Sequence, residues 1–292
     1  MGTFSRSVSL LRSSWEVLRQ DKELMLLPVL SAIAASLMML PFLAGAFLAS
    51  DTTQVLETTG SSSPQFSMQP VGWVLLFIGY LLVSYVAIFF QAALVLAAND
   101  RMTGGSPTLG SALSMAAANA GRILPWAVIS ATVSIIISAI QQRAGIAGRI
   151  VGGIAGVAWT LVTLLVVPIL VIDQVGVKEA LTRSGRAFKQ TWGENVVGNG
   201  GIGLIGFLGM LAGLIVFGGI AFVGVSSSVP ALVVTGIALF AIWAIVLTAF
   251  TSAMNGVFRT ALYRYAVHGE ESPGFTHEQI AGAFRPKGRT GR

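Results

Sequence analysis

The chain has 292 residues, of which 54% are hydrophobic and only 10% are charged, and its formal net charge is +6. A soluble domain carries about 25% charged residues, so this composition excludes an ordinary soluble globular protein. The absence of cysteine excludes disulfides, thiolate metal sites and cysteine nucleophiles.

The first predicted element is an amphipathic helix over about 4–22. One of its faces is apolar, and its cations lie on the remaining surface. A helix of this kind lies in the membrane interface and turns its cations toward lipid head groups. We therefore expect three basic residues to face anionic lipid: Arg12, Arg19 and Lys22.

Six apolar stretches without charged residues follow, each about 20 residues or longer, the length that crosses a bilayer as a helix. They lie at about 24–49, 71–98, 123–142, 150–172, 196–224 and 230–258. Residues 1–268 are therefore predicted to form one membrane domain, and 269–292 a basic cytoplasmic tail with a short helix. The first stretch is too long for a signal-peptide core and is expected to stay uncleaved; cleavage after it is the alternative.

Two further amphipathic helices are predicted before later pairs of spans, at about 107–121 and 176–192. In the second, Arg183, Arg186 and Lys189 lie off the apolar face and are expected to face lipid. The fold class predicted is all-α: a polytopic transmembrane bundle of six spans with cytoplasmic interfacial helices. The order of elements favours a threefold repeat of one helix and one hairpin.

Basic residues indicate the orientation. All but two of the 18 Lys and Arg residues fall on one side of the predicted spans, and the exceptions are Arg143 and Arg149. By the positive-inside rule, both termini are expected in the cytoplasm of a cell (plasma or inner) membrane. The cations lie beside spans, so the expected partners are the lipid bilayer and anionic head groups, with no nucleic acid.

Short motifs at both ends carry a resemblance to a known family. They are Phe4-Ser5-Arg6 with Ser14-Trp15, Asp21-Lys22-Glu23-Leu24 before Leu27-Pro28, and Ala281-Gly282-Ala283-Phe284-Arg285. The chain resembles a family of uncharacterised six-span prokaryotic membrane proteins, a domain of unknown function. It is more loosely similar to the membrane region of some glycerophosphodiester phosphodiesterases. The resemblance implies a six-span fold and no activity, and the chain has no room for a soluble phosphodiesterase barrel.

Motifs that could carry chemistry are few. The glycines of Gly201–Gly206 match G-x-G-x-x-G, but a dinucleotide site needs a preceding strand, so close helix packing is the better interpretation. Gly209 and Gly213, four residues apart, are expected to serve the same purpose. Asp173 ends the fourth span and is either a proton or cation site or a residue that interacts with Arg101 or with the N-terminus of the following helix.

No catalytic, cofactor or metal site is predicted. The His and Glu residues after the last span match no ligand spacing, and Pro273-Gly274 interrupts them. Inside the spans, polar side chains are scarce, and three amides stand out: Gln91, Asn199 and Asn255. Such amides either bridge helices or line a cavity.

Two functions remain open at this point. The first is a non-enzymatic membrane-embedded scaffold, a partner of another membrane protein, or a lipid-organising protein. The alternative is a permease or a transporter of lipid or small molecules that is not coupled through buried charges, because no charged residue lies within a span. A membrane enzyme is the third reading.

Overall fold

The computed structural model describes residues 22–50, 69–143, 145–192 and 201–269, and its regular structure in these ranges is helical, without a β-strand. The elements in chain order are η1 (Lys22–Met25), α2 (Leu26–Leu48), α4 (Pro70–Met102), α5 (Leu109–Ala118), α6 (Ala120–Arg143), α7 (Gly145–Thr163), α8 (Val166–Ile172), α9 (Val177–Trp192), α10 (Gly201–Ser226), α11 (Pro230–Tyr263) and the π-helical turn η3 (Arg264–His268).

Six of these segments are long and apolar enough to span a membrane. They are Glu23–Leu48, Pro70–Met102, Ala120–Gln142, Gly145–Ile172, Gly206–Ser226 and Pro230–His268. The expected all-helical chain with six candidate spans is therefore confirmed. The predicted leader helix with Arg12 and Arg19 lies outside the described residues, as does the tail after 269.

The helix expected over 107–121 is shorter, because α5 ends at Ala118 and α6 begins at Ala120. Asn119 separates the two helices. Its side-chain amide donates to the Met115 carbonyl at 3.0 Å, and its amide oxygen accepts from Arg122 at 3.2 Å. Asn competes with the helical backbone for hydrogen bonds in this way, which favours a helix end over a helix interior.

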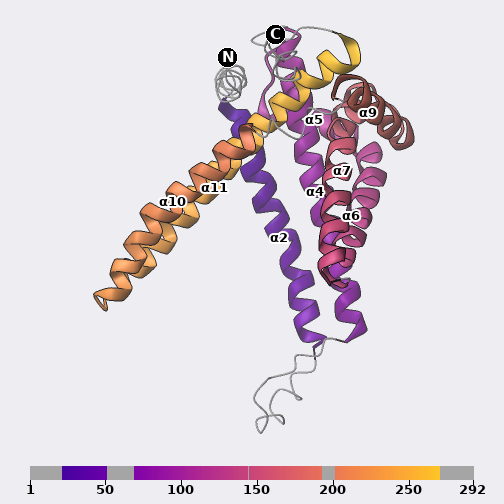
Figure 1. The fold of residues 1–292 in the computed structure, drawn as a ribbon. Helices are drawn as coiled ribbons and strands as arrows, with labels where there is room; N and C mark the ends of the chain where they lie inside the picture. The colour runs from indigo at the N-terminus through magenta and orange to yellow at the C-terminus, as the bar shows by residue number, and fades with distance from the viewer. Residues whose placement is uncertain (1–21, 51–68, 144, 193–200, 270–292) are drawn as a thin grey trace, which may run out of the picture.

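The core lies at one end of the bundle, where α2 begins and α4 and α11 end (Figure 1). We call this the basic end, because α9 and its cations lie there. Small side chains let α4 pack closely: Ala92, Ala93, Ala97 and Ala98 are all buried. They meet the buried helix α8 and the last turns of α11, where Met254, Val257 and Tyr263 are buried.

The fourth candidate span is not one continuous helix. It breaks at Leu164 and Leu165, between α7 and α8. Pro168 lies in the first turn of α8, where its missing N–H costs no helical hydrogen bond. The buried Ser184 of α9 joins the two sides of the break, since its hydroxyl donates to the Val162 carbonyl at 2.5 Å and accepts from the Leu165 N–H at 3.3 Å. One side chain thus satisfies backbone groups that the break leaves without helical partners.

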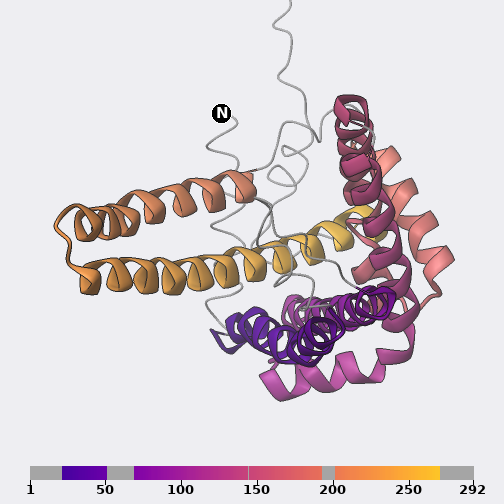
Figure 2. The ribbon, with the colours of Figure 1, turned by 90° about the horizontal axis from the view of Figure 1, so that it is seen from below.

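The hairpin of α10 and α11 points away from the other helices, and only the later part of α11 returns to the core (Figures 1 and 2). Its two helices touch closely, because a Cβ on Gly236 would lie 2.6 Å from the Ala221 nitrogen and 2.7 Å from the Phe217 carbonyl oxygen. Gly213 similarly makes room for Trp243, whose indole N–H donates to the Gly209 carbonyl at 3.0 Å. The predicted role in helix packing is confirmed for Gly209 and Gly213, whereas a Cβ on Gly203 would meet no neighbouring atom.

Candidate functional site

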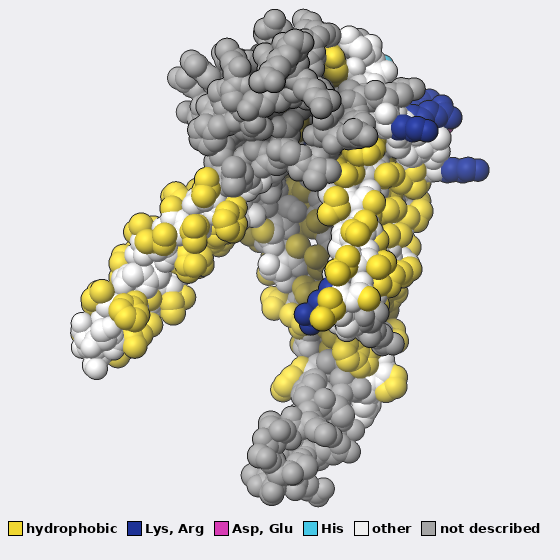
Figure 3. Space-filling view, in the orientation of Figure 1, with side chains coloured by type: hydrophobic (Ala, Val, Ile, Leu, Met, Phe, Trp, Pro, Cys, Tyr) yellow, Lys and Arg dark blue, Asp and Glu magenta, His cyan; other side chains and the backbone are white. Residues whose placement is uncertain are grey.

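Helix α9 carries a basic outer face at the basic end. Its buried residues, Ala180, Ser184 and Ala187, pack toward the bundle. Lys178, Arg186 and Lys189 are exposed, and Figure 3 shows Lys and Arg side chains projecting over this helix. Arg186 and Lys189, two of the cations predicted to face lipid, are therefore on the surface of the protein.

Arg183 differs from these two, because it binds within the protein. Its guanidinium donates to Asp173 Oδ2 at 3.1 Å and also to Glu179. The hydrogen bond to Glu179 and the neighbouring negative charges raise the pKa of Arg183 above its ordinary value. The residue that sequence pattern assigned to the lipid surface thus connects α9 to the end of α8.

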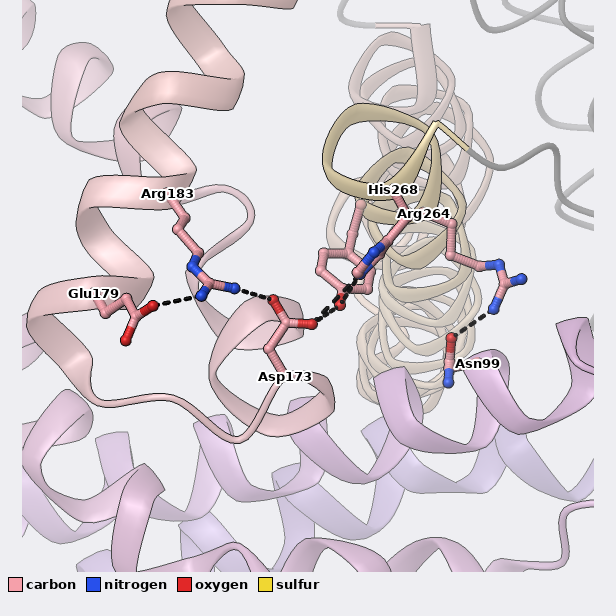
Figure 4. A network of polar contacts seen from close by, with 7 residues as sticks. Asn99, Asp173, Glu179, Arg183, Arg264 and His268 are labelled. Carbon is pink, nitrogen blue, oxygen red and sulfur yellow. Dashed lines mark hydrogen bonds and ion pairs between the residues drawn. The ribbon is translucent and has the colours of Figure 1, made fainter.

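Asp173 lies close to polar side chains of three elements, α9, α11 and η3 (Figure 4). Its side chain is 11% exposed and accepts from Arg183 on one oxygen and from the Tyr263 hydroxyl on the other. The His268 Nε2 atom lies 3.4 Å from the same Asp173 oxygen and 2.8 Å from the Tyr263 oxygen. We call Asp173, Arg183, Tyr263 and His268 the clasp.

A second polar contact lies beside the clasp. Arg264, the first residue of η3, donates to the Asn99 amide oxygen of α4 at 3.1 Å (Figure 4). The clasp and this contact connect the ends of α4, α8 and α11 with the middle of α9. Asp173 does contact the following helix, but through the Arg183 side chain and not through the helix N-terminus. Tyr263 and His268 were not predicted, since 90 residues separate Tyr263 from Asp173.

A cavity of about 440 Å³ lies between α2, α4 and α11. Gln91 of α4 and Asn255 of α11 both line it, so the structure brings together two of the three amides that the sequence singled out. The third, Asn199, lies outside the described residues. The complete lining is Pro28, Ser31, Ala32, Ala35, Ala87, Phe90, Gln91, Leu94, Ser252, Asn255, Gly256 and Arg259.

The polar groups of the cavity form a row along α11. Ser252, Asn255 and Arg259 are three and four residues apart, which places them on one helical face. Arg259 was predicted only as part of the charge bias, although this spacing could have joined it to Asn255. Gly256 lies on the same side, and a Cβ there would come within 2.3 Å of Leu94. α11 can therefore approach α4 closely beside the cavity.

Among the described residues, no group of three or more His, Asp or Glu side chains could hold a metal ion. Lys22 begins η1, and its side chain lies outside the described part of the structure. The cavity and the basic face of α9 are the two candidate sites in the described part of the chain.

A family model matches residues 70–274, more than half of the chain, and its description is a family of unknown function. No curated protein and no solved structure matches the chain. The looser likeness to the membrane region of glycerophosphodiester phosphodiesterases therefore finds no support in these comparisons, whereas the resemblance to an uncharacterised domain does. The chain belongs to the family of unknown function DUF6159.

Proposed function

We propose that this chain is a non-enzymatic integral membrane protein of the cell membrane that binds anionic lipid at its cytoplasmic face and organises it there. The observation that supports this most directly is α9, which packs its small residues on the bundle and turns Lys178, Arg186 and Lys189 outward. Cations at the end of a membrane span meet anionic head groups and gain about 1 kcal/mol each.

The arrangement of elements supports the orientation and the repeat that belong to this proposal. α5 precedes the hairpin of α6 and α7, and α9 precedes the hairpin of α10 and α11. Both short helices lie at the basic end, where the positive-inside rule places the cytoplasm. The sequence predicts a leader helix over 4–22, outside the described residues, which would be the first unit of the proposed threefold pattern, with both termini in the cytoplasm.

The test is lipid selectivity of the full chain in nanodiscs, measured with spin-labelled phosphatidylglycerol and phosphatidylcholine. Changing Lys178, Arg186 and Lys189 together to Gln should lower the preference for phosphatidylglycerol several-fold, and high salt should lower it in the unaltered chain. A charge-conserving control, Lys178→Arg with Lys189→Arg, should retain the preference. Equal selectivity in the neutralised and unaltered chains contradicts the proposal.

A second candidate function is a lipid or small-molecule permease. It is favoured by the break between α7 and α8 and by the amides of the cavity, because interrupted helices commonly form transport sites. In vesicles containing fluorescent phosphatidylglycerol, Gln91→Ala with Asn255→Ala should then abolish flux across the bilayer. An absence of flux with the unaltered chain excludes this candidate for that lipid.

A further inference from the structure

Arg259 is the charged residue of the cavity between α2, α4 and α11. It is half-buried, and no side chain among the described residues forms a hydrogen bond or an ion pair with it. The same holds for the side-chain amides of Gln91 and Asn255 in the described part of the chain. The cavity therefore presents one cation and two amides whose hydrogen-bonding capacity the described protein leaves unused.

These groups favour an anion. A guanidinium in surroundings of low dielectric constant is costly without a negative partner. It donates in a planar fork that matches a phosphate, and amide N–H groups can complete the coordination. No described carboxylate lines the cavity, so an anion in it would be attracted by Arg259 and would face no like charge among the lining residues.

The position of the row along α11 indicates an amphiphile. Arg259 lies one helical turn before Tyr263 of the clasp, at the basic end, and Ser252 lies about 10 Å deeper, at 1.5 Å per residue. Apart from Arg259, the serines and the amides, the wall is apolar, with Ala32, Ala35 and Phe90 among its residues. The cation thus lies nearest the basic end and uncharged groups lie farther in, which matches a phospholipid with its phosphate at Arg259 and its acyl chains beyond.

The splayed hairpin provides space for acyl chains. Figure 3 shows a wide wedge between the α10–α11 hairpin and the helices to its right, bordered by hydrophobic side chains. The hairpin exposes large apolar residues along its length, including Phe207, Ile215 and Phe222 of α10 and Val234 and Ile237 of α11. The cavity volume of about 440 Å³ can hold a head group, and the apolar border of the wedge suits acyl chains.

We propose that this cavity is a binding site for one anionic phospholipid, with its phosphate on Arg259, Gln91 and Asn255 and its acyl chains in the wedge. The occupant is assigned by charge complementarity to Arg259 and by the apolar wedge. The inference goes beyond the proposed function, because it places a single, specific lipid between α2, α4 and α11, whereas α9 attracts anionic lipid through its exposed surface.

The experiment is native mass spectrometry of the detergent-purified full chain, titrated with phosphatidylglycerol. One lipid should be retained, and Arg259→Gln should weaken its binding about tenfold or more, as expected for loss of a hydrogen-bonded charge. Arg149→Gln on α7 is the matched control: it removes the same charge from an exposed position outside both proposed lipid sites and should leave the retained lipid unchanged. Equal weakening by both variants, or by neither, overturns the proposal.

Two further arms identify the ligand. Phosphatidylcholine should bind at least about tenfold more weakly than phosphatidylglycerol, and soluble glycerol phosphate should not compete at equal concentration, because it lacks acyl chains. Equal binding of both lipids contradicts the role of charge, and competition by glycerol phosphate contradicts an amphiphile site. A lipid-free dimer as the main species overturns the proposal in favour of a second copy in the wedge.

A filling variant covers the case in which Arg259→Gln does not fold. Ala32 is exposed at the cavity wall, so Ala32→Phe should be tolerated while its ring occupies the space of the head group. Loss of the retained lipid with every charge in place supports the site, and full retention overturns it. The neutralised α9 variant should keep this lipid, which makes failure of this inference distinguishable from failure of the proposed function.

Discussion

Helix α8 at the basic end of the bundle and the outer part of the α10–α11 hairpin are both apolar but have opposite surroundings. At the basic end, Ile169 of α8 is fully buried by its own chain, whereas Ile215 of α10 is 66% exposed. The first region is held by packing and by the clasp. The second relies on contact between its two helices, and its remaining apolar surface suits an apolar solvent. Hydrophobicity alone therefore does not distinguish a protein core from a surface made for lipid.

Removing the same side chain from both regions gives the largest expected difference. Ile169→Ala should lower the free energy of unfolding by about 2–5 kcal/mol, because it leaves a cavity in a packed core. Ile215→Ala, the matched control, should change it by less than about 0.5 kcal/mol, as at other exposed sites. Denaturant unfolding of the full chain in detergent measures both. Similar losses would mean that the hairpin surface is packed by protein.

Breaking the clasp should have the next largest effect. Asp173→Ala removes the carboxylate acceptor of the buried Tyr263 hydroxyl, which then keeps only its contact with His268. We expect a loss of about 2 kcal/mol from this buried contact, with nothing counted for the exposed Arg183. Glu179→Ala removes the exposed partner of the same arginine and should cost much less. The two variants are compared by thermal unfolding. Equal costs would show that Asp173 acts only through its surface charge.

The smallest effect is expected inside the hairpin. Trp243→Phe keeps an aromatic ring but removes the N–H that donates to the Gly209 carbonyl, and should cost about 1 kcal/mol. Trp73→Phe is the control, because Trp73 is exposed and near the start of α4. The readout is protease cleavage between α10 and α11 as denaturant rises. Unchanged cleavage of the Trp243 variant would mean that this hydrogen bond does not stabilise the hairpin and that packing between its two helices does.

The sequence predicted the helices far better than their mutual contacts. Long charge-free stretches located the candidate spans, because bilayer length and polarity constrain each helix locally. Pro168 indicates a kink or a helix start in the fourth span, but the sequence does not give the break at Leu164 and Leu165, because it depends on Ser184 of α9 as a distant partner. Gln91 and Asn255 were identified by their polarity alone. Their meeting with Arg259 depends on how three helices pack, which no spacing within one helix reveals.

The length of α11 has a mechanical consequence. Its 34 residues extend about 51 Å at 1.5 Å per residue, whereas the hydrocarbon layer is about 30 Å thick. A helix of excess length fits by tilting, and α11 runs obliquely to α2 (Figure 1). Because α10 and α11 pack closely at Gly236, a change in the tilt of α11 is expected to move both helices of the hairpin together, as one arm. We therefore expect a thinner bilayer to swing the arm outward and a thicker one to bring it toward α2.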